Sequence, residues 1–284
     1  VLPVRPSPTS AARRITAALL ALTLTAALAS CGSDGADEAG PDDETAPAVT
    51  TDALGEAGEG PAWNAPPSDE SAYPVTIEHA LGSTTVDSAP KRIAAVGLTD
   101  QDVLIALGIL PVLTVEWFGG HPGAIFPWAV DEAEDLGDID DIVVLDPTVT
   151  MSGEQVAVAD PDLIVGLYGD ITQDQYDALS KIAPTIVQPE GPGYGISWQD
   201  QTLTMGTIVG KRDFAEQLVE DTEARIAEVR AAHPDLEGKT AIMVAPYEGI
   251  YVYGSNDPRG RVLEELGMVI PEELDAVASG ASAG

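Results

Sequence analysis

"PKRIAAVGLTDQDVLIALGILPV", residues 90–112, holds the unit that decides the fold. Its segment 92–97 is a short apolar run, which predicts a buried strand. Residues 99–108 follow with a helical apolar pattern that has Thr99 in the capping position and ends on a glycine. A second apolar run occupies residues 111–117. The order strand, helix, strand predicts a parallel βαβ unit.

The same alternation continues along the chain. Residues 160–168 predict a third strand and residues 184–189 a fourth. Between them, residues 171–183 predict a helix that starts with a capping box formed by Thr172 and Gln175. This alternation predicts an α/β fold in which helices cover a parallel sheet.

After the fourth strand the pattern changes. Residues 197–210 and 211–233 are two helical stretches with no strand between them, and the second would form a rod of about 30 Å. Strands are predicted again at 239–247 and 249–254, followed by a helix at 258–266 that starts with Asp-Pro. The order is one α/β unit, a long helix and the start of another α/β unit.

The first thirty residues have the features of an export signal. Three arginines and no acidic residue accompany an apolar run at 15–28, which is shorter than the ~20 residues that span a bilayer. The run ends in "LASCG" (28–32), where small residues surround Cys31, the single cysteine of the chain. This stretch resembles the lipobox of bacterial lipoproteins, and the resemblance implies that Cys31 is a lipidation site. No other thiol remains for catalysis, a disulfide or a metal.

Acidic residues dominate the composition. The net charge is −34, and it becomes −37 once the three arginines of residues 1–30 are removed. This charge argues against nucleic acid as a partner, because nucleic-acid binding needs a basic face. Residues 31–72 contain eleven Asp and Glu, no Lys or Arg, and many Gly, Pro and Ala. That composition predicts a disordered acidic linker.

From about Tyr73 to Gly267 the sequence resembles the substrate-binding lipoproteins of ABC importers for ferric siderophores and cobalamin. The resemblance lies in an ordered set of segments: "PKRIAAVGLTDQDVLIALGILPV", "GEQVAVADPDLIVG", "LSKIAPTIV", a tryptophan followed by "MGTIVGK", and "VYGSNDPRGRVLEELG". Each segment alone is a weak pattern. Their order behind a lipidation motif and an acidic linker is specific.

The resemblance implies the class III periplasmic-binding-protein fold, with two Rossmann-like lobes joined by one long rigid helix. The second lobe has fewer elements than the family pattern, so a truncated lobe is expected. The implied layout is a signal peptide at 1–30, the linker at 31–72, an N-terminal α/β lobe at 73–196, a helical connection at 197–233 and a partial C-terminal α/β lobe at 234–284.

The resemblance also implies location and partners. The protein is expected to be exported, monomeric and anchored through lipidated Cys31 to the outer face of the cytoplasmic membrane. Its expected partners are an ABC permease and the ATPase of that permease. Glu154 matches the acidic residue by which the family's first lobe docks on the permease, although a glutamate in the first turn of a helix is also favourable by itself.

Candidate ligand-binding residues follow from the predicted sheet, because ligands of open α/β sheets bind beyond the carboxyl ends of the strands. Aromatic residues make up only 5% of the chain, yet they gather at these positions, which favours a large and partly flat ligand. Three of the candidates have alternative roles. Trp117 would instead cover the end of the sheet, Tyr253 would pack within its strand, and His121 would be a loop residue without contact to a ligand. The candidates are Thr99, Trp117, His121, Tyr168, Tyr194, Tyr247, Tyr253 and Arg259.

A ferric siderophore is the expected ligand, with no cofactor. Arg259 would offer a planar fork of donors to the oxygens of a chelate. Haem and cobalamin remain open as ligands. A site for a bare metal ion is disfavoured, because His79, His121 and His233 are the only histidines. An enzyme is also disfavoured, because the sequence has no G-x-S-x-G, H-E-x-x-H or P-loop motif, and no G-x-G-x-x-G after a strand.

Overall fold

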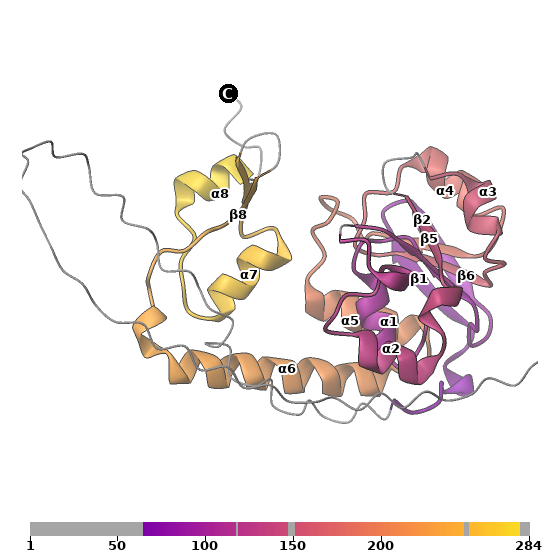
Figure 1. Cartoon of the computed structure of the whole chain (residues 1–284), viewed down its shortest axis with the longest axis horizontal. Coiled ribbons are helices and arrows are strands. Elements are labelled where there is room, and N and C mark those ends of the chain that lie inside the picture. Colours follow the sequence, from indigo (N-terminus) through magenta and orange to yellow (C-terminus); the bar gives the residue numbers. More distant parts are fainter. Residues whose placement is uncertain (1–64, 118, 147–150, 247–249, 279–284) are drawn as a thin grey trace, which may run out of the picture. The chain divides into compact units, whose positions relative to one another are not determined.

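The computed structural model describes residues 65–117, 119–146, 151–246 and 250–278, all within one compact unit of the chain (Figure 1). Cys31 and Tyr247 lie outside the described residues. The strands are β1 (Val75–His79), β2 (Gly82–Val86), β3 (Ile93–Ala95), β4 (Leu113–Val115), β5 (Val143–Leu145), β6 (Leu163–Gly166), β7 (Thr185–Val187), β8 (Met243–Pro246) and β9 (Ile250–Tyr253). The helices are α1 (Asp100–Ala106), α2 (Val130–Leu136), α3 (Gly153–Ala157), α4 (Gln173–Leu179), α5 (Trp198–Ile208), α6 (Arg212–Ala232), α7 (Pro258–Glu265) and α8 (Glu272–Ala278).

A parallel five-stranded sheet forms the centre of the first lobe. Its strand order is β5-β4-β3-β6-β7, and β3 lies in the middle, where Ile93 pairs with Leu163 and Ala94 with Leu113. The predicted parallel sheet is therefore confirmed. Strand β5 was not predicted, because its apolar run (142–145) is only four residues long and follows several acidic residues.

Helices cover both faces of this sheet, and the alternation along β3 shows why. Ile93 and Ala95 pack in one core with residues of α1, α5 and α6, while Ala94 and Val96 pack in a second core with residues of α3 and α4. Successive side chains of a strand point to opposite faces, so a continuous apolar run is needed where both faces are buried. Figure 1 shows α3 and α4 together at one edge of the lobe, and α1 beside α5.

The predicted helix ends are partly confirmed. Thr172 and Gln175 form the predicted capping box of α4, and Gly108 ends the turn after α1 with φ of 72°. The prediction that the Thr99 side chain caps α1 is wrong. Thr99 occupies the N-cap position without a side-chain capping bond, and its hydroxyl accepts a hydrogen bond from Gln201 Nε2 at 3.2 Å.

The described part of the chain includes residues before Tyr73. The amide of Asp69 donates to the carbonyl of Gly210 at 2.8 Å, and Glu70–Ala72 form a 3-10 turn. The predicted linker therefore extends too far, because its last residues pack where α5 meets α6. Beyond them lies an unpredicted antiparallel hairpin of β1 and β2, which is fastened to β7 by the Thr84 hydroxyl donating to the carbonyl of Thr185 at 2.6 Å.

The long helix predicted at 211–233 is present as α6, with 21 residues. It packs on α5 through Ala215 and Leu218, and it contacts α7 farther along. Val229, farther along the helix, is 40% exposed, so the buried face covers only the first part of the helix. None of the described helices is long and apolar enough to cross a membrane.

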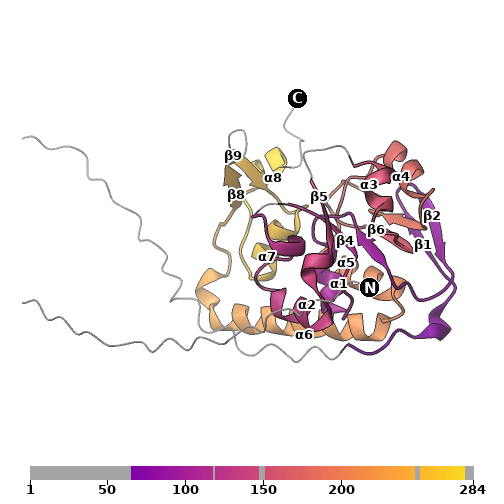
Figure 2. The ribbon, with the colours of Figure 1, turned by 45° about the vertical axis from the view of Figure 1, so that its right-hand side comes forward.

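The elements predicted after the long helix are present, with a different pairing. Strands β8 and β9 pair with each other in an antiparallel hairpin, which Figure 2 shows together with α7 and α8. A second parallel sheet was expected at this position. The described parallel pairing in this part is a single bridge between Thr240 and Val269. Helix α7 begins as predicted, with Asp257 as N-cap and Pro258 in the first turn.

Candidate functional site

Arg259, in the first turn of α7, is held by the residue that caps the same helix. Asp257 Oδ1 accepts from the Arg259 backbone N at 2.9 Å and from Nε at 2.7 Å, while Oδ2 accepts from Nη2 at 2.6 Å. The two side chains are 28% and 18% exposed. A capping aspartate two residues before an arginine thus fixes the guanidinium by a two-point ion pair.

Three aromatic residues surround this guanidinium. Arg259 Cζ lies 3.7 Å from the ring centroid of Tyr253 and 5.8 Å from that of Trp117, and Nη2 donates to the Tyr168 hydroxyl at 3.1 Å. We call Trp117, Tyr168, Tyr253, Asp257 and Arg259 the Arg259 cluster. Four of these five residues are candidates from the sequence, and they come from the ends of β4, β6 and β9 and from α7.

Two titratable hydrogen-bond donors of the cluster, Arg259 and Tyr168, are protonated at physiological pH. Burial lowers the pKa of Arg259, but the hydrogen bonds and charge of Asp257 outweigh it, so the pKa lies above the usual value. Burial and the charge of Asp257 raise the pKa of Tyr168 to about 12, so its phenol is neutral at physiological pH. The Tyr168 oxygen accepts from Arg259, which leaves its own O–H to donate to an oxygen acceptor.

Tyr194 joins the cluster to its surroundings. Its ring meets that of Tyr168 edge to face, with centroids 5.4 Å apart, and its amide donates to the carbonyl of Gly169 at 3.1 Å. The backbone of Tyr194 has φ of 58°, a left-handed conformation that costs energy for a side chain of this size. The side chain is 41% exposed, so this strained turn holds an aromatic face toward solvent.

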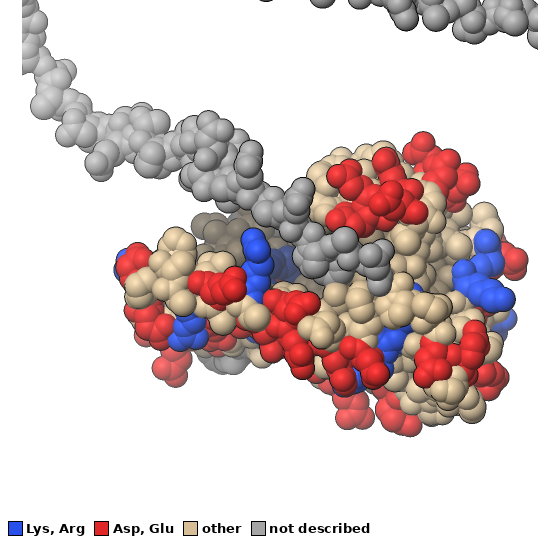
Figure 3. All heavy atoms as spheres, turned by 90° about the horizontal axis from the view of Figure 1, so that it is seen from below, with Lys and Arg blue, Asp and Glu red and all other residues tan. Residues whose placement is uncertain are grey.

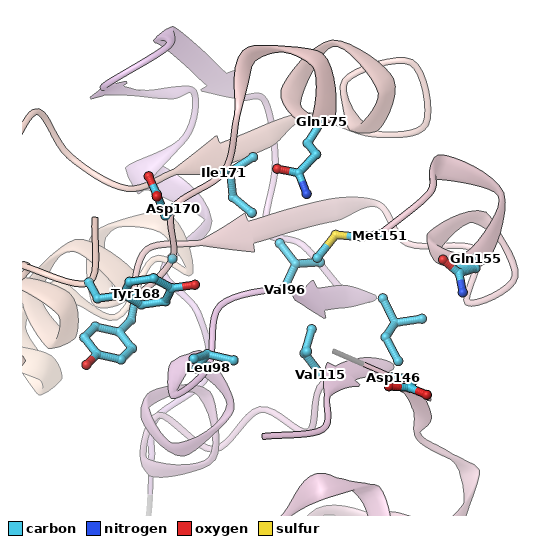
Figure 4. A pocket seen from close by; sticks show the side chains of 13 residues that line it. Val96, Leu98, Val115, Asp146, Met151, Gln155, Tyr168, Asp170, Ile171 and Gln175 are labelled. Carbon is cyan, nitrogen blue, oxygen red and sulfur yellow. The ribbon is translucent and has the colours of Figure 1, made fainter. Parts of the chain in front are cut away.

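Two cavities border these residues. The strand-end pocket has a volume of about 330 Å³ and lies at the carboxyl ends of β3 to β6 (Figure 4). A second cavity of about 250 Å³ shares Tyr194 with it and includes Tyr253 and Asp257 in its wall. The wall of the strand-end pocket consists of Val96, Leu98, Val115, Leu145, Asp146, Met151, Gln155, Tyr168, Gly169, Asp170, Ile171, Gln175 and Tyr194.

A buried carboxylate fixes the backbone beside this pocket. Asp100 is fully buried, and its oxygens accept from the amides of Leu167 and Tyr168 at 2.8 and 3.2 Å and from Gln201 Nε2 at 2.7 Å. Burial raises the pKa of Asp100, and these hydrogen bonds oppose the rise. The sequence analysis missed this role, although an acidic residue inside the decisive apolar stretch was a usable signal.

The remaining sequence candidates lie apart from the Arg259 cluster. His121 packs on Phe126, with ring centroids 5.4 Å apart, and Phe126 stacks on Trp128 at 4.6 Å. This side group touches the cluster through Trp117, whose ring centroid is 6.2 Å from that of Phe126. Thr99 lines neither cavity. Glu154 is exposed in the first turn of α3. No group of three metal-ligating side chains occurs among the described residues.

Asp102, near this aromatic side group, provides a pH-dependent test of the structure. Burial raises the pKa of Asp102 from 3.8 to about 6, although a hydrogen bond from Trp128 acts to lower it. Its Oδ1 is buried and has no hydrogen-bond partner in the described part of the chain. The folded state therefore loses stability as pH rises from about 4 to about 6, by up to about 3 kcal/mol.

We expect Asp102→Asn to raise the free energy of unfolding by about 1–2 kcal/mol at pH 8, after a small loss of helix-dipole energy, and to leave it unchanged near pH 4. Urea unfolding at both pH values measures this. Asp174→Asn, in the exposed first turn of α4, is the control and is expected to lose a few tenths of a kcal/mol at pH 8. An Asp102→Asn variant no more stable than wild type at pH 8 would contradict the burial of this carboxylate.

Comparison with known proteins places this geometry in context. The sequence model of the periplasmic binding protein family matches residues 93–279. A probable siderophore-binding lipoprotein of Bacillus subtilis, YfiY, is 29% identical over 202 residues, which are 70% of this chain and 58% of that protein. The ferric-anguibactin-binding protein FatB of Vibrio anguillarum is 26% identical over 212 residues, 72% of this chain and 62% of FatB. The chain thus spans about 60% of the length of these relatives.

Solved structures show the same α/β architecture. A periplasmic solute binding protein of Mycobacterium smegmatis superposes with a TM-score of 0.63 at 32% identity, covering 69% of this chain and 68% of that one. PiaA of Streptococcus pneumoniae, in complex with ferrichrome, superposes with a TM-score of 0.63 at 28% identity, covering 73% and 71%. The predicted fold class is confirmed, and these neighbours are binding proteins, not enzymes.

Proposed function

The chain belongs to the periplasmic binding protein family, and on that premise we propose that it is an extracytoplasmic solute-binding protein that captures a ferric siderophore. It delivers the chelate to an ABC permease powered by its ATPase. Binding is the whole chemical task, and no cofactor takes part. The relatives named for siderophores and the PiaA complex with ferrichrome support this substrate class.

The Arg259 cluster is the observation that carries this proposal. A siderophore presents oxygen acceptors around the iron and often a flat organic surface. Arg259 donates through Nε and Nη2 within the cluster, and Nη1 makes no hydrogen bond among the described residues, so it remains for a ligand. Tyr168 adds an O–H donor, and Trp117 and Tyr253 add faces on which a flat group packs.

The proposal also covers the segments outside the binding site, which serve export, anchoring and docking. Residues 1–30 serve as the signal, Cys31 carries the lipid, and the acidic segment behind it acts as a tether. Glu154, exposed on α3, docks on the permease. Helix α6 is one uninterrupted helix of 21 residues, so the two lobes move by a small hinge around a stiff connection.

A fluorescence titration tests the substrate class. The chain has four tryptophans, and Trp117 lies in the Arg259 cluster, so a ferric siderophore is expected to quench the emission saturably with a Kd below about 1 μM. Trp117→Phe is expected to lose most of the quenching, while calorimetry still detects binding.

Iron-free siderophore, a ferric salt, haem and cobalamin are the controls. Quenching by haem or cobalamin alone would overturn the siderophore assignment and keep the family. Silence across the whole panel, by fluorescence and calorimetry, would overturn a solute-binding role for these ligands.

A further inference from the structure

The distribution of basic residues limits which chelates the proposed site can hold. Thirteen residues are Lys or Arg, three of them lie in residues 1–30, and the other ten are all described. Lys91 and Arg92 precede β3 and Lys181 precedes β7, so they lie at the amino ends of the strands, away from the strand-end pocket. Five more lie in or near α6 or before β8: Lys211, Arg212, Arg225, Arg230 and Lys239. Only Arg259 and Arg261 remain near the two cavities.

Neither of these two arginines is among the residues that line the two cavities. Arg259 is paired at two points with Asp257. Arg261 directs Nη2 to the carbonyls of Gly195 and Asn256 at 2.8 and 3.1 Å and Nε to the carbonyl of Ser255 at 3.2 Å, and its Nη1 is buried. Arg261 therefore fastens the loop before α7 to the loop before α5.

The charged residues in the walls of the two cavities are acidic. The described wall of the strand-end pocket contains Asp146 and Asp170 and no Lys, Arg or His (Figure 4). The described wall of the second cavity contains Asp257 and Asp275 and again no basic residue. Beyond the site, acidic side chains spread over the face in Figure 3, with basic ones scattered among them, and the chain carries a net charge of −34.

From this arrangement we infer that the site takes ferric chelates of zero or positive net charge, such as trihydroxamates, and rejects polyanionic chelates, with Asp257 as the specificity-determining residue. A ferric trihydroxamate is neutral, because three singly charged hydroxamates balance the iron. A ferric tricatecholate keeps three negative charges. Placing it beside these carboxylates, with no basic residue in the described cavity walls, would cost Coulomb energy at close range and slow its approach. The inference rests on the proposed function and narrows it.

Asp257→Asn tests this selectivity without removing the helix cap. Asparagine caps a helix about as well as aspartate, so α7 is expected to keep its start, while the charge that neutralises Arg259 is gone. We expect wild type to bind a neutral ferric trihydroxamate at least about tenfold more tightly than a ferric tricatecholate at low salt. Asp257→Asn should lower the ratio of trihydroxamate affinity to tricatecholate affinity about tenfold. A trihydroxamate with a free ammonium group should bind more weakly as salt rises.

Glu228→Gln is the matched control, because it removes one negative charge from an exposed position on α6. It is expected to leave both affinities within about twofold of wild type. Wild type binding the tricatecholate as tightly as the trihydroxamate would overturn the inference and keep the siderophore function. An equal effect of Asp257→Asn and Glu228→Gln would overturn the role of Asp257. Binding of no ferric siderophore at all would overturn the proposed function together with the inference.

Discussion

Arg259→Ala is expected to weaken binding of the ferric siderophore by about 2–3 kcal/mol, a roughly 30- to 150-fold rise in Kd. The substitution removes charge-assisted donors and the cation that packs between Trp117 and Tyr253. It also leaves Asp257 unpaired beside the second cavity. Isothermal calorimetry with the siderophore identified by fluorescence measures the loss.

Two further variants separate the site from general charge effects. Arg259→Lys keeps a positive charge but lacks the planar fork and the stacking surface, so an intermediate loss is expected. Arg225→Ala removes an exposed arginine of α6 and should bind as wild type does. Full affinity in Arg259→Ala would show that the Arg259 cluster is not the binding site.

Asp100→Ala is expected to lower the free energy of unfolding by about 3–5 kcal/mol, the largest stability change among the substitutions considered. The buried amides of Leu167 and Tyr168 would lose their acceptor, and the side-chain amide of Gln201 would keep only the Thr99 hydroxyl. Each buried donor left without a partner costs on the order of 1–3 kcal/mol. Urea unfolding followed by far-UV circular dichroism measures the change.

The control for this variant is Asp213→Ala, which removes an exposed carboxylate from the first turn of α6. It should cost no more than about 1 kcal/mol, the usual helix-dipole contribution. Because Asp100 holds the backbone of Tyr168, the folded fraction of Asp100→Ala should also bind the siderophore more weakly. Equal losses in the two variants would mean that the hydrogen bonds of Asp100 are not needed for the fold.

Local patterns were enough to predict the elements whose signals are contained within a few residues. The capping box of Thr172 and Gln175 and the start of α7 at Asp257 depend on side chains that reach only two or three residues along the chain. Short elements were missed for the complementary reason. A three-residue strand such as β5 has no measurable period of its own, and pairing with β4 specifies it.

Some residues of the candidate site could be selected from the sequence and others could not. The rule that ligands bind beyond the strand ends selected Trp117, Tyr168, Tyr253 and Arg259, and the structure brings these four together. The same rule also selected Thr99 and His121, whose described contacts lie elsewhere. Position after a strand indicates which edge of the sheet a residue occupies, but packing of the neighbouring loop decides what its side chain touches.

The sequence by itself determined the class of this protein: the parallel sheet, the long helix, the acidic charge and the set of aromatic residues at the strand ends. Each of these is written in composition or in a period of a few residues. The tertiary structure decided how charge is distributed at the site. Asp257 neutralises Arg259, Arg261 donates to backbone carbonyls, and Asp100 fixes the backbone at Tyr168. The sequence pattern does not contain these contacts, because they depend on side-chain directions. The contacts of Tyr168 and Gly195 also join residues more than sixty positions apart.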